Sequence, residues 1–238
     1  MATNCRINNW ITSDDDAYFE DACEACVGDS IYPIEGEFYC VMHFPSQNKI
    51  AEFRAALKQK TDKNDFNFCC VYFPEKTTFG RESSSFSKSE QLTYKKVDFR
   101  CATFSNDVFF THINFQNAQF ENAIFKGNAY FNIPWFNIYP CSFHIVDFSN
   151  AIFHGEAYFN NAIFNNDAKF QNVRFDGKVD FKNTKFQGNI DFSNVMFGGD
   201  TNFRDAKFVN RVCFNSTIFG EQTSFIESSF DGKVDFNK

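Results

Sequence analysis

Long apolar runs, a basic leader and clustered positive charge are all missing from this sequence of 238 residues. No apolar run approaches the roughly 20 residues that span a bilayer, and the polar N-terminus lacks the regions of a secretory signal peptide. These absences predict a cytoplasmic protein. The net charge of −7 argues against direct nucleic-acid binding, because a phosphate backbone is bound by clustered Lys and Arg.

A disulfide framework is not indicated either, although the chain has nine cysteines. Their number is odd, and the five that follow residue 60 share no spacing, so reduced thiols with one metal site are predicted. These five are Cys69, Cys70, Cys101, Cys141 and Cys213.

Recognisable catalytic motifs are absent as well. The sequence has no phosphate-binding glycine loop, no nucleophile elbow and no HExxH motif. His112, His144 and His154 have no recurring partner and are expected to be solvated surface residues. The chain is therefore predicted not to be an enzyme.

Phenylalanine dominates what is present, with 36 residues, while the mean hydropathy is −0.39. From Phe148 to Phe236 the gaps between phenylalanines alternate five and six, which would scatter the rings around an α-helix. The residue two positions before each Phe is small or β-branched nearly everywhere, as at Ala162 and Val195. Period-two spacing puts both side chains on one side of an extended segment. Five-residue units then mostly have Asn or Asp, as at Asn117 and Asn150, and six-residue units often have Gly. These residues are expected to form the corners because they tolerate left-handed backbone.

Four such edges make a coil of about 22 residues, because Phe148, Phe170 and Phe192 recur at that interval. The prediction is an all-β solenoid over residues 65–238 with four ladders of stacked Phe rings. About six coils give a rod on the order of 30 Å long. The regular spacing of the Phe residues is broken near Pro134 and Pro140, where a small loop or bulge is expected. Residues 81–90 are predicted to form another loop.

The segment before the solenoid divides into two predicted parts. Residues 1–45 form a Cys/His-rich region, and residues 46–64 contain an amphipathic helix over about 47–60. Ser46 is a potential N-cap, and Ile50, Phe53 and Leu57 recur at helical spacing. Solenoids need polar-faced caps, so this helix is expected to cover the open end of the coils.

The repeat resembles the pentapeptide-repeat family, in which a central Leu or Phe follows a small residue and an Asn or Asp. Residues 122–125 and 161–164, both Asn-Ala-Ile-Phe, match this pattern directly. The resemblance covers about residues 98–238 and implies a right-handed quadrilateral β-helix. The chain departs from the family pattern by adding a sixth residue in alternate units.

A zinc site is predicted from Cys23 and Cys26, followed after thirteen residues by Cys40 and His43. Two ligand pairs with two residues between their members suit tetrahedral zinc, and such a closed site would be structural. Four reduced cysteines with an incidental His remain the alternative. The segment also resembles the Cys-rich leader of some bacterial pentapeptide-repeat proteins, which implies Cys5 as an alternative ligand.

A non-enzymatic scaffold for protein–protein interaction is the favoured function, since rigid repetitive rods offer docking surfaces. One stripe of partly apolar outward positions is a candidate contact face, although scattered exposed apolar residues are also normal. The positions are Tyr130, Ile152, Arg174, Met196 and Ile218.

The resemblance also implies an alternative, a DNA mimic that binds DNA gyrase or topoisomerase. A mimic needs acidic faces, whereas residues 98–238 contain 15 acidic and 12 basic residues, a net charge of only −3. The sequence ends two residues after Phe236 without a capping element, and uncovered coil ends favour pairing. We therefore expect an end-to-end homodimer or a chain truncated from a longer protein.

Overall fold

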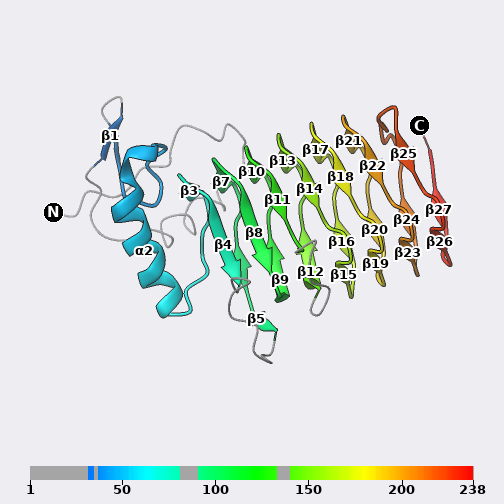
Figure 1. Cartoon of the computed structure of the whole chain (residues 1–238), viewed down its shortest axis with the longest axis horizontal. Coiled ribbons are helices and arrows are strands. Elements are labelled where there is room, and N and C mark those ends of the chain that lie inside the picture. The colour runs from blue at the N-terminus through cyan, green and yellow to red at the C-terminus, as the bar shows by residue number, and fades with distance from the viewer. Residues whose placement is uncertain (1–31, 35–36, 81–90, 133–139, 238) are drawn as a thin grey trace.

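Short parallel strands wind into a rod of about six turns of roughly 22 residues, with one helix at the N-terminal end (Figure 1). The computed structural model describes residues 32–34, 37–80, 91–132 and 140–237. Every strand pair along the rod is parallel, and each strand pairs with its counterpart in the next coil. The predicted all-β solenoid is confirmed.

Two faces of the rod are separate sheets. The first comprises β3 (Tyr72–Phe73), β7 (Thr103–Phe104), β10 (Ile124–Phe125), β13 (Ile152–Phe153), β17 (Arg174–Phe175) and β21 (Met196–Phe197). The second comprises β4 (Thr77–Gly80), β8 (Val108–Thr111), β11 (Ala129–Tyr130), β14 (Ala157–Tyr158), β18 (Val179–Asp180), β22 (Thr201–Asn202) and β25 (Thr223–Ser224).

The other two faces form a single 12-stranded sheet, because two long strands run straight across the corner between them. These are β9 (Ile113–Gln119) and β12 (Ser142–Asp147). One face adds β5 (Leu92–Tyr94), β15 (Ile163–Phe164), β19 (Lys185–Phe186), β23 (Lys207–Phe208) and β26 (Ser229–Phe230). The other adds β6 (Val97–Asp98), β16 (Ala168–Lys169), β20 (Ile190–Asp191), β24 (Val212–Cys213) and β27 (Val234–Asp235).

The interior consists of four ladders of Phe rings, as the spacing predicts. Phe170 is fully buried, and its ring stacks 5.0 Å from Phe148 on one side and 5.0 Å from Phe192 on the other. Between ladders the rings meet edge to face, as Phe170 does with Phe181 at 87°. Both arrangements are favourable for aromatic quadrupoles. The small residues two positions earlier are buried beside them; Thr184, for example, donates its hydroxyl to the Phe159 carbonyl.

The corners after five-residue units use left-handed backbone, as predicted for Asn and Asp. Asn150, Asn172 and Asn194 have φ near +60°, and their side-chain amides bond to each other from coil to coil at 3.0 Å. Asn117 is an exception to that prediction, because it lies within the straight strand β9. Asparagine is enriched in this conformation because its short polar side chain can bond locally.

Glycines at the six-residue corners have a different role from the predicted one. None of Gly127, Gly155, Gly177, Gly188, Gly199 and Gly232 has a positive φ. A Cβ on any of them would instead lie 2.1 to 2.7 Å from backbone of the preceding coil. Close approach of stacked coils, rather than left-handed geometry, therefore requires glycine there.

The predicted loops near Pro134 and over residues 81–90 lie mostly outside the described residues, but the ladders show their effect. Phe120 stacks on Phe148, 28 residues later, instead of 21 or 22. Phe143 stacks between Phe115 and Phe164 at 5.3 and 4.9 Å. The insertion is therefore accommodated without interrupting the core.

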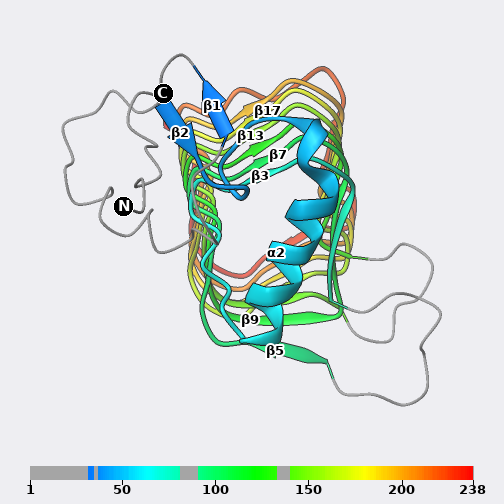
Figure 2. The ribbon, with the colours of Figure 1, turned by 90° about the vertical axis from the view of Figure 1, so that its left-hand side faces the viewer.

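The N-terminal end of the rod is covered by helix α2 (Ile50–Asp62), which follows the 3-10 turn η3 (Gln47–Lys49) (Figure 2). The Ser46 hydroxyl accepts from the Asn48 N–H, and buried Phe53 meets the Phe73 ring of the first coil at 5.5 Å. The predicted capping helix is thus confirmed. Before it, β1 (Tyr32–Ile34) and β2 (Glu37–Tyr39) form an antiparallel pair. No helix in the described part of the chain is long and apolar enough to cross a membrane.

Candidate functional site

Two of the predicted metal ligands lie together in the turn that follows β2. Backbone N–H groups of His43 and Phe44 both donate to the Cys40 carbonyl, which closes the turn. This brings Cys40 Sγ within 3.1 Å of His43 Nδ1, and both residues are buried. Cys5, Cys23 and Cys26 lie outside the described residues, and among those described no group of three or more potential ligands occurs.

The geometry of this pair fits a zinc site. A tetrahedral zinc ion would hold a thiolate sulfur and an imidazole nitrogen about 3.5 Å apart, close to the observed separation. His43 Nε2 lies 3.2 Å from the Cys69 carbonyl, which can only accept, so the proton is on Nε2. Nδ1 then carries a lone pair towards Cys40, and a backbone carbonyl orients the ring as it does behind many metal-bound histidines.

The predicted contact face follows the sheet of β3 to β21, but one member is wrong. Tyr130 pairs with Tyr158 on the neighbouring face, and Ile124 pairs with Ile152 in its place. A constant step of 22 residues fails here because the coil between Phe125 and Phe153 is 28 residues long. The outward column, here called the aliphatic column, is Tyr72, Thr103, Ile124, Ile152, Arg174, Met196 and Ile218.

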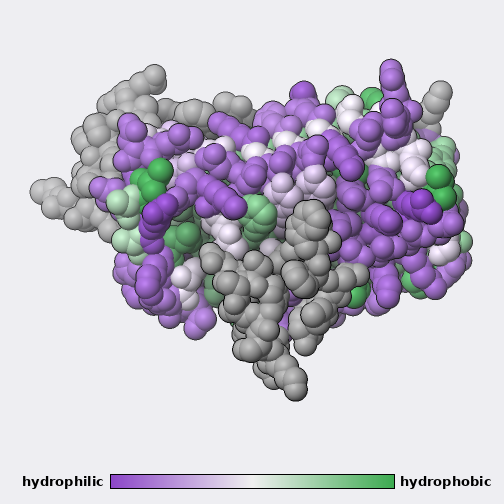
Figure 3. Space-filling view, viewed as in Figure 1, coloured by the Kyte–Doolittle hydropathy of each residue, from purple (hydrophilic) through white to green (hydrophobic). Residues whose placement is uncertain are grey.

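Apolar side chains in the aliphatic column become more exposed towards the C-terminal end. Ile124 and Ile152 are half-buried, whereas Met196 is 41% and Ile218 60% exposed. Most of the surface in the view of Figure 3 is polar, and apolar residues gather near the ends of the rod. Arg174 interrupts the column, and its Nε bonds to Asp176 Oδ1 at 2.6 Å.

Tyr130 belongs to an aromatic column that was not predicted from the sequence. The rings of Phe109, Tyr130 and Tyr158 stack at 4.4 and 4.9 Å, nearly parallel. Lys76 lies 4.6 Å from the Phe109 ring. A hydrogen bond to the Glu156 carboxylate raises the pKa of the Tyr158 phenol above its usual value. These contacts occupy the faces of the rings within the column.

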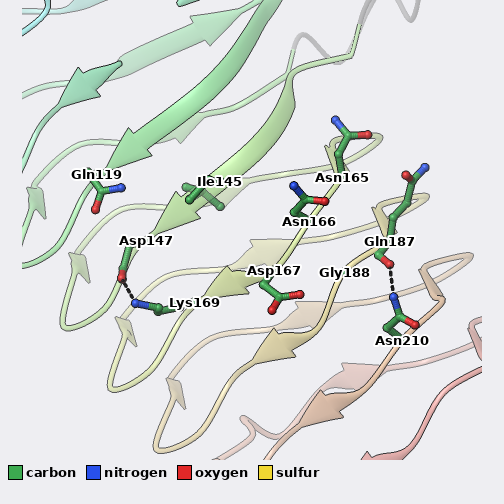
Figure 4. Close-up of a pocket in the computed structure, with 11 residues that line it drawn as sticks. Gln119, Ile145, Asp147, Asn165, Asn166, Asp167, Lys169, Gln187, Gly188 and Asn210 are labelled. Atoms are coloured by element: carbon green, nitrogen blue, oxygen red, sulfur yellow. Dashed lines mark hydrogen bonds and ion pairs between the residues drawn. The ribbon is translucent and has the colours of Figure 1, made fainter. Parts of the chain in front are cut away.

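A groove of about 580 Å³ lies on the 12-stranded sheet, where the straight strand β12 meets the six-residue corners of the following coils (Figure 4). Ile145, 47% exposed, forms its apolar part, and Asp147 bonds to Lys169 at 2.8 Å. The remaining lining is mainly amide side chains, including Asn166 and Asn210. This groove was not predicted, because it depends on the difference in corner length between successive coils and not on the residues of one coil.

Of His112, His144 and His154, two are exposed and one is buried. His144 and His154 are exposed as expected, and His154 Nδ1 lies 2.8 Å from Asp176 Oδ2. His112 is instead buried, at a left-handed corner between β8 and β9 with φ of +58°, so its predicted solvent exposure is wrong.

Charges on the rod are mixed, and several of them form ion pairs in the described coils. Arg204 bonds to Glu227 at 3.1 Å, and Arg211 and Lys233 both contact Asp235 at 2.6 Å. Hydrogen bonds from Lys233 and Arg211 lower the pKa of Asp235 below its usual value. This alternation does not favour the DNA-mimic interpretation, which needs continuous acidic faces.

Comparison with known families agrees with the repeat geometry. Residues 159–207 match a family model described as pentapeptide repeats, in nine copies. The match lies within the regular coils, between the Phe159 and Phe208 rungs. A comparison with curated proteins finds no match.

Proposed function

We propose that this chain, whose coils carry pentapeptide repeats, is a non-enzymatic scaffold that holds a protein partner against the aliphatic column. The observation that carries the proposal is an outward column in which Ile124 and Ile152 lie on adjacent rungs, and Met196 and Ile218 on adjacent rungs beyond Arg174. Apolar groups held rigidly at one rung spacing lose little entropy on binding. An exposed apolar stripe with polar flanks is typical of a protein contact surface.

Charging the aliphatic column should abolish partner capture. In a variant with Ile152→Glu, Met196→Glu and Ile218→Glu, partner recovery by pull-down with cross-linking is expected to fall at least tenfold, because buried unpaired charges oppose docking. A control with Lys182→Glu, Lys185→Glu and Ser229→Glu adds charge at exposed positions elsewhere. Equal recovery of the same partner by both variants would refute the assignment of this face.

The proposed scaffold also holds a structural zinc ion at its N-terminal end, bound by Cys23, Cys26, Cys40 and His43, with Cys5 as the alternative ligand. The support is the converging pair of Cys40 and His43 together with the orienting Cys69 carbonyl. Zinc would supply the folding energy that so short a segment cannot obtain from a core. Thiolate ligands suit a reducing compartment, and we place the protein in the cytoplasm.

Metal analysis of the purified chain should give about one zinc per chain. Cys40→Ser and His43→Ala are expected to lose most of it, whereas Cys213→Ser should retain it, because that thiol lies beside Ser193 in a distant coil. Comparing Cys5→Ser with Cys23→Ser identifies the remaining ligands. Unchanged zinc content in Cys40→Ser would contradict the site.

End-to-end pairing through the last coil is the third part of the proposal. The Phe236 and Phe230 rings stack on one side only among the described residues and are 61% and 36% exposed. β25, β26 and β27 are the last strands of their sheets in the part of the chain that the structure describes, where no further strand pairs with their outer edges. Light scattering is expected to give a dimer that Phe230→Lys with Phe236→Lys converts to a monomer. A monomeric wild-type chain at high concentration would exclude this pairing.

A further inference from the structure

Two cysteines occupy the first rungs of a corner column that asparagines fill further along the rod. Every residue of this column has left-handed backbone, with φ between +54° and +60°. The column is Cys70, Cys101, Asn122, Asn150, Asn172, Asn194 and Ser216. The Cys70 N–H donates to the Arg100 carbonyl at 2.7 Å, which repeats the bond from the Asn172 N–H to the Ser193 carbonyl at 3.0 Å. Cys70 and Cys101 are therefore stacked in register.

Side chains in this column contact their neighbours in the next coil. The amides of Asn150, Asn172 and Asn194 do so at 3.0 Å. The side chain of Cys70 lies close enough to that of Cys101 to shift its pKa. Neighbouring rungs lie about 4.8 Å apart, within the Cα separation of roughly 4.4 to 6.8 Å that a disulfide requires. Both residues are half-buried, so a small solute can reach them.

The two thiols differ in acidity. The hydrogen bond from Cys70 lowers the pKa of Cys101, and the charge of the adjacent Arg100 acts in the same direction. The corresponding bond raises the pKa of Cys70. Cys101 is therefore the better nucleophile of the pair, since thiolates rather than thiols react. Cys141 offers a contrast, because complete burial raises its pKa.

We propose that Cys70 and Cys101 form a redox-responsive pair, which a hydroperoxide oxidises to a disulfide that links the first two coils. The Cys101 thiolate attacks the peroxide oxygen and becomes a sulfenic acid, while the O–O bond breaks and an alcohol or water leaves after protonation. The Cys70 sulfur then attacks the Cys101 sulfur, and the sulfenic oxygen leaves as water with the Cys70 proton. Two thiols are oxidised by two electrons, and one peroxide bond is reduced.

The bond would connect the coil that packs against α2 to the next coil. Phe73, in that first coil, contacts Phe53 of the helix, and 31 residues separate the two cysteines. A cross-link of this span restricts the unfolded chain and stabilises the capped end. Oxidation would therefore stabilise the N-terminal end of the scaffold. Because Cys70 and Cys101 already lie on neighbouring rungs, the bond would form without moving the coils.

Peptide mapping after hydrogen peroxide treatment of the full chain tests the pair directly. Trypsin cleaves after Lys63, Lys76, Arg100 and Lys126, so residues 101–126 carry Cys101 as their one cysteine. The expected product is this peptide linked to residues 64–76, lighter by two hydrogen atoms than the sum of its parts. Fragmentation places the link at Cys70 rather than at its neighbour Cys69, whose sulfur lies 3.8 Å from that of Cys70.

Variants make the assignment independent of fragmentation. The link should be lost in Cys70→Ser and kept in Cys69→Ser and in Cys213→Ser. Loss in Cys69→Ser with retention in Cys70→Ser, a link from Cys101 to an N-terminal cysteine, or oxidation of Cys101 to sulfinic acid without a link would each overturn the proposal. Protection from peroxide that a chelator removes would assign the thiols to a metal and would also overturn it.

Discussion

Replacing Phe170 with alanine is expected to lower the free energy of unfolding by about 3 to 5 kcal/mol. The ring is fully buried, stacks on Phe148 and Phe192 at 5.0 Å each, and meets Phe159 and Phe181 edge to face. Its removal leaves a cavity between coils whose backbones are fixed by hydrogen bonds on both sides. Because such coils cannot collapse around the space, the loss should fall towards the upper end of the range.

Chemical denaturation followed by circular dichroism gives the change, and Phe236→Ala is the matched control. Phe236 continues the same ladder but is 61% exposed, so its removal should cost about 1 kcal/mol or less. Solenoids can unfold in segments, and amide exchange should therefore show the largest loss of protection in the coils next to Phe170. Equal destabilisation by the two substitutions would mean that the buried ladders are not the main source of stability.

The ladders could be predicted because one chemical rule repeats at every edge. An inward Phe, a small inward neighbour and a polar corner recur in sequence, and each is enforced by the packing of the coils above and below. Cys40 and His43 were similarly recognisable, since a spacing of three residues within a tight turn brings their side chains to 3.1 Å. These features depend on local spacing, which the sequence displays directly.

The predictions that are wrong concern positions where local spacing does not determine the register between coils. A constant step of 22 residues predicts Tyr130 in the column of Ile152, but the intervening coil has 28 residues and Ile124 occupies that rung. His112 has the polar character of an outward corner residue, yet it is buried at the left-handed corner between β8 and β9. The position of Tyr130 depends on which coil lies next to which. The stacked Phe rings show this order, whereas a count of residues does not.

The groove beside β12 has the same origin. Phe143 and Phe148 are five residues apart and allow a straight strand, whereas Phe164 and Phe170 are six apart and the chain bends between β15 and β16. The unequal corners leave the space lined by Ile145, Asn166 and their neighbours. A difference of one residue between successive coils thus creates a surface feature that neither coil encodes alone.

Gly188→Ala is expected to destabilise the rod by about 3 kcal/mol, although alanine is normally compatible with a negative φ. A Cβ at Gly188 would lie 2.1 Å from the Asn166 carbonyl carbon and 2.3 Å from the Asp167 nitrogen. Both are backbone atoms, so the coils must separate at this corner. That movement would strain the bond from the Asn189 N–H to Asp167, which is 2.7 Å long.

Gly198→Ala is the control, because the nearest atom to its Cβ would be the Phe175 carbonyl oxygen at 3.0 Å and the next contact lies at 3.5 Å. We expect it to cost less than about 1 kcal/mol in the same denaturation experiment. Gly188→Asn separates the two explanations for glycine at these corners. Asparagine tolerates left-handed backbone, so it would restore stability if conformation were the constraint. Because the constraint is the space between coils, Gly188→Asn should be at least as destabilising as Gly188→Ala, and a wild-type stability for this variant would contradict the close-approach argument.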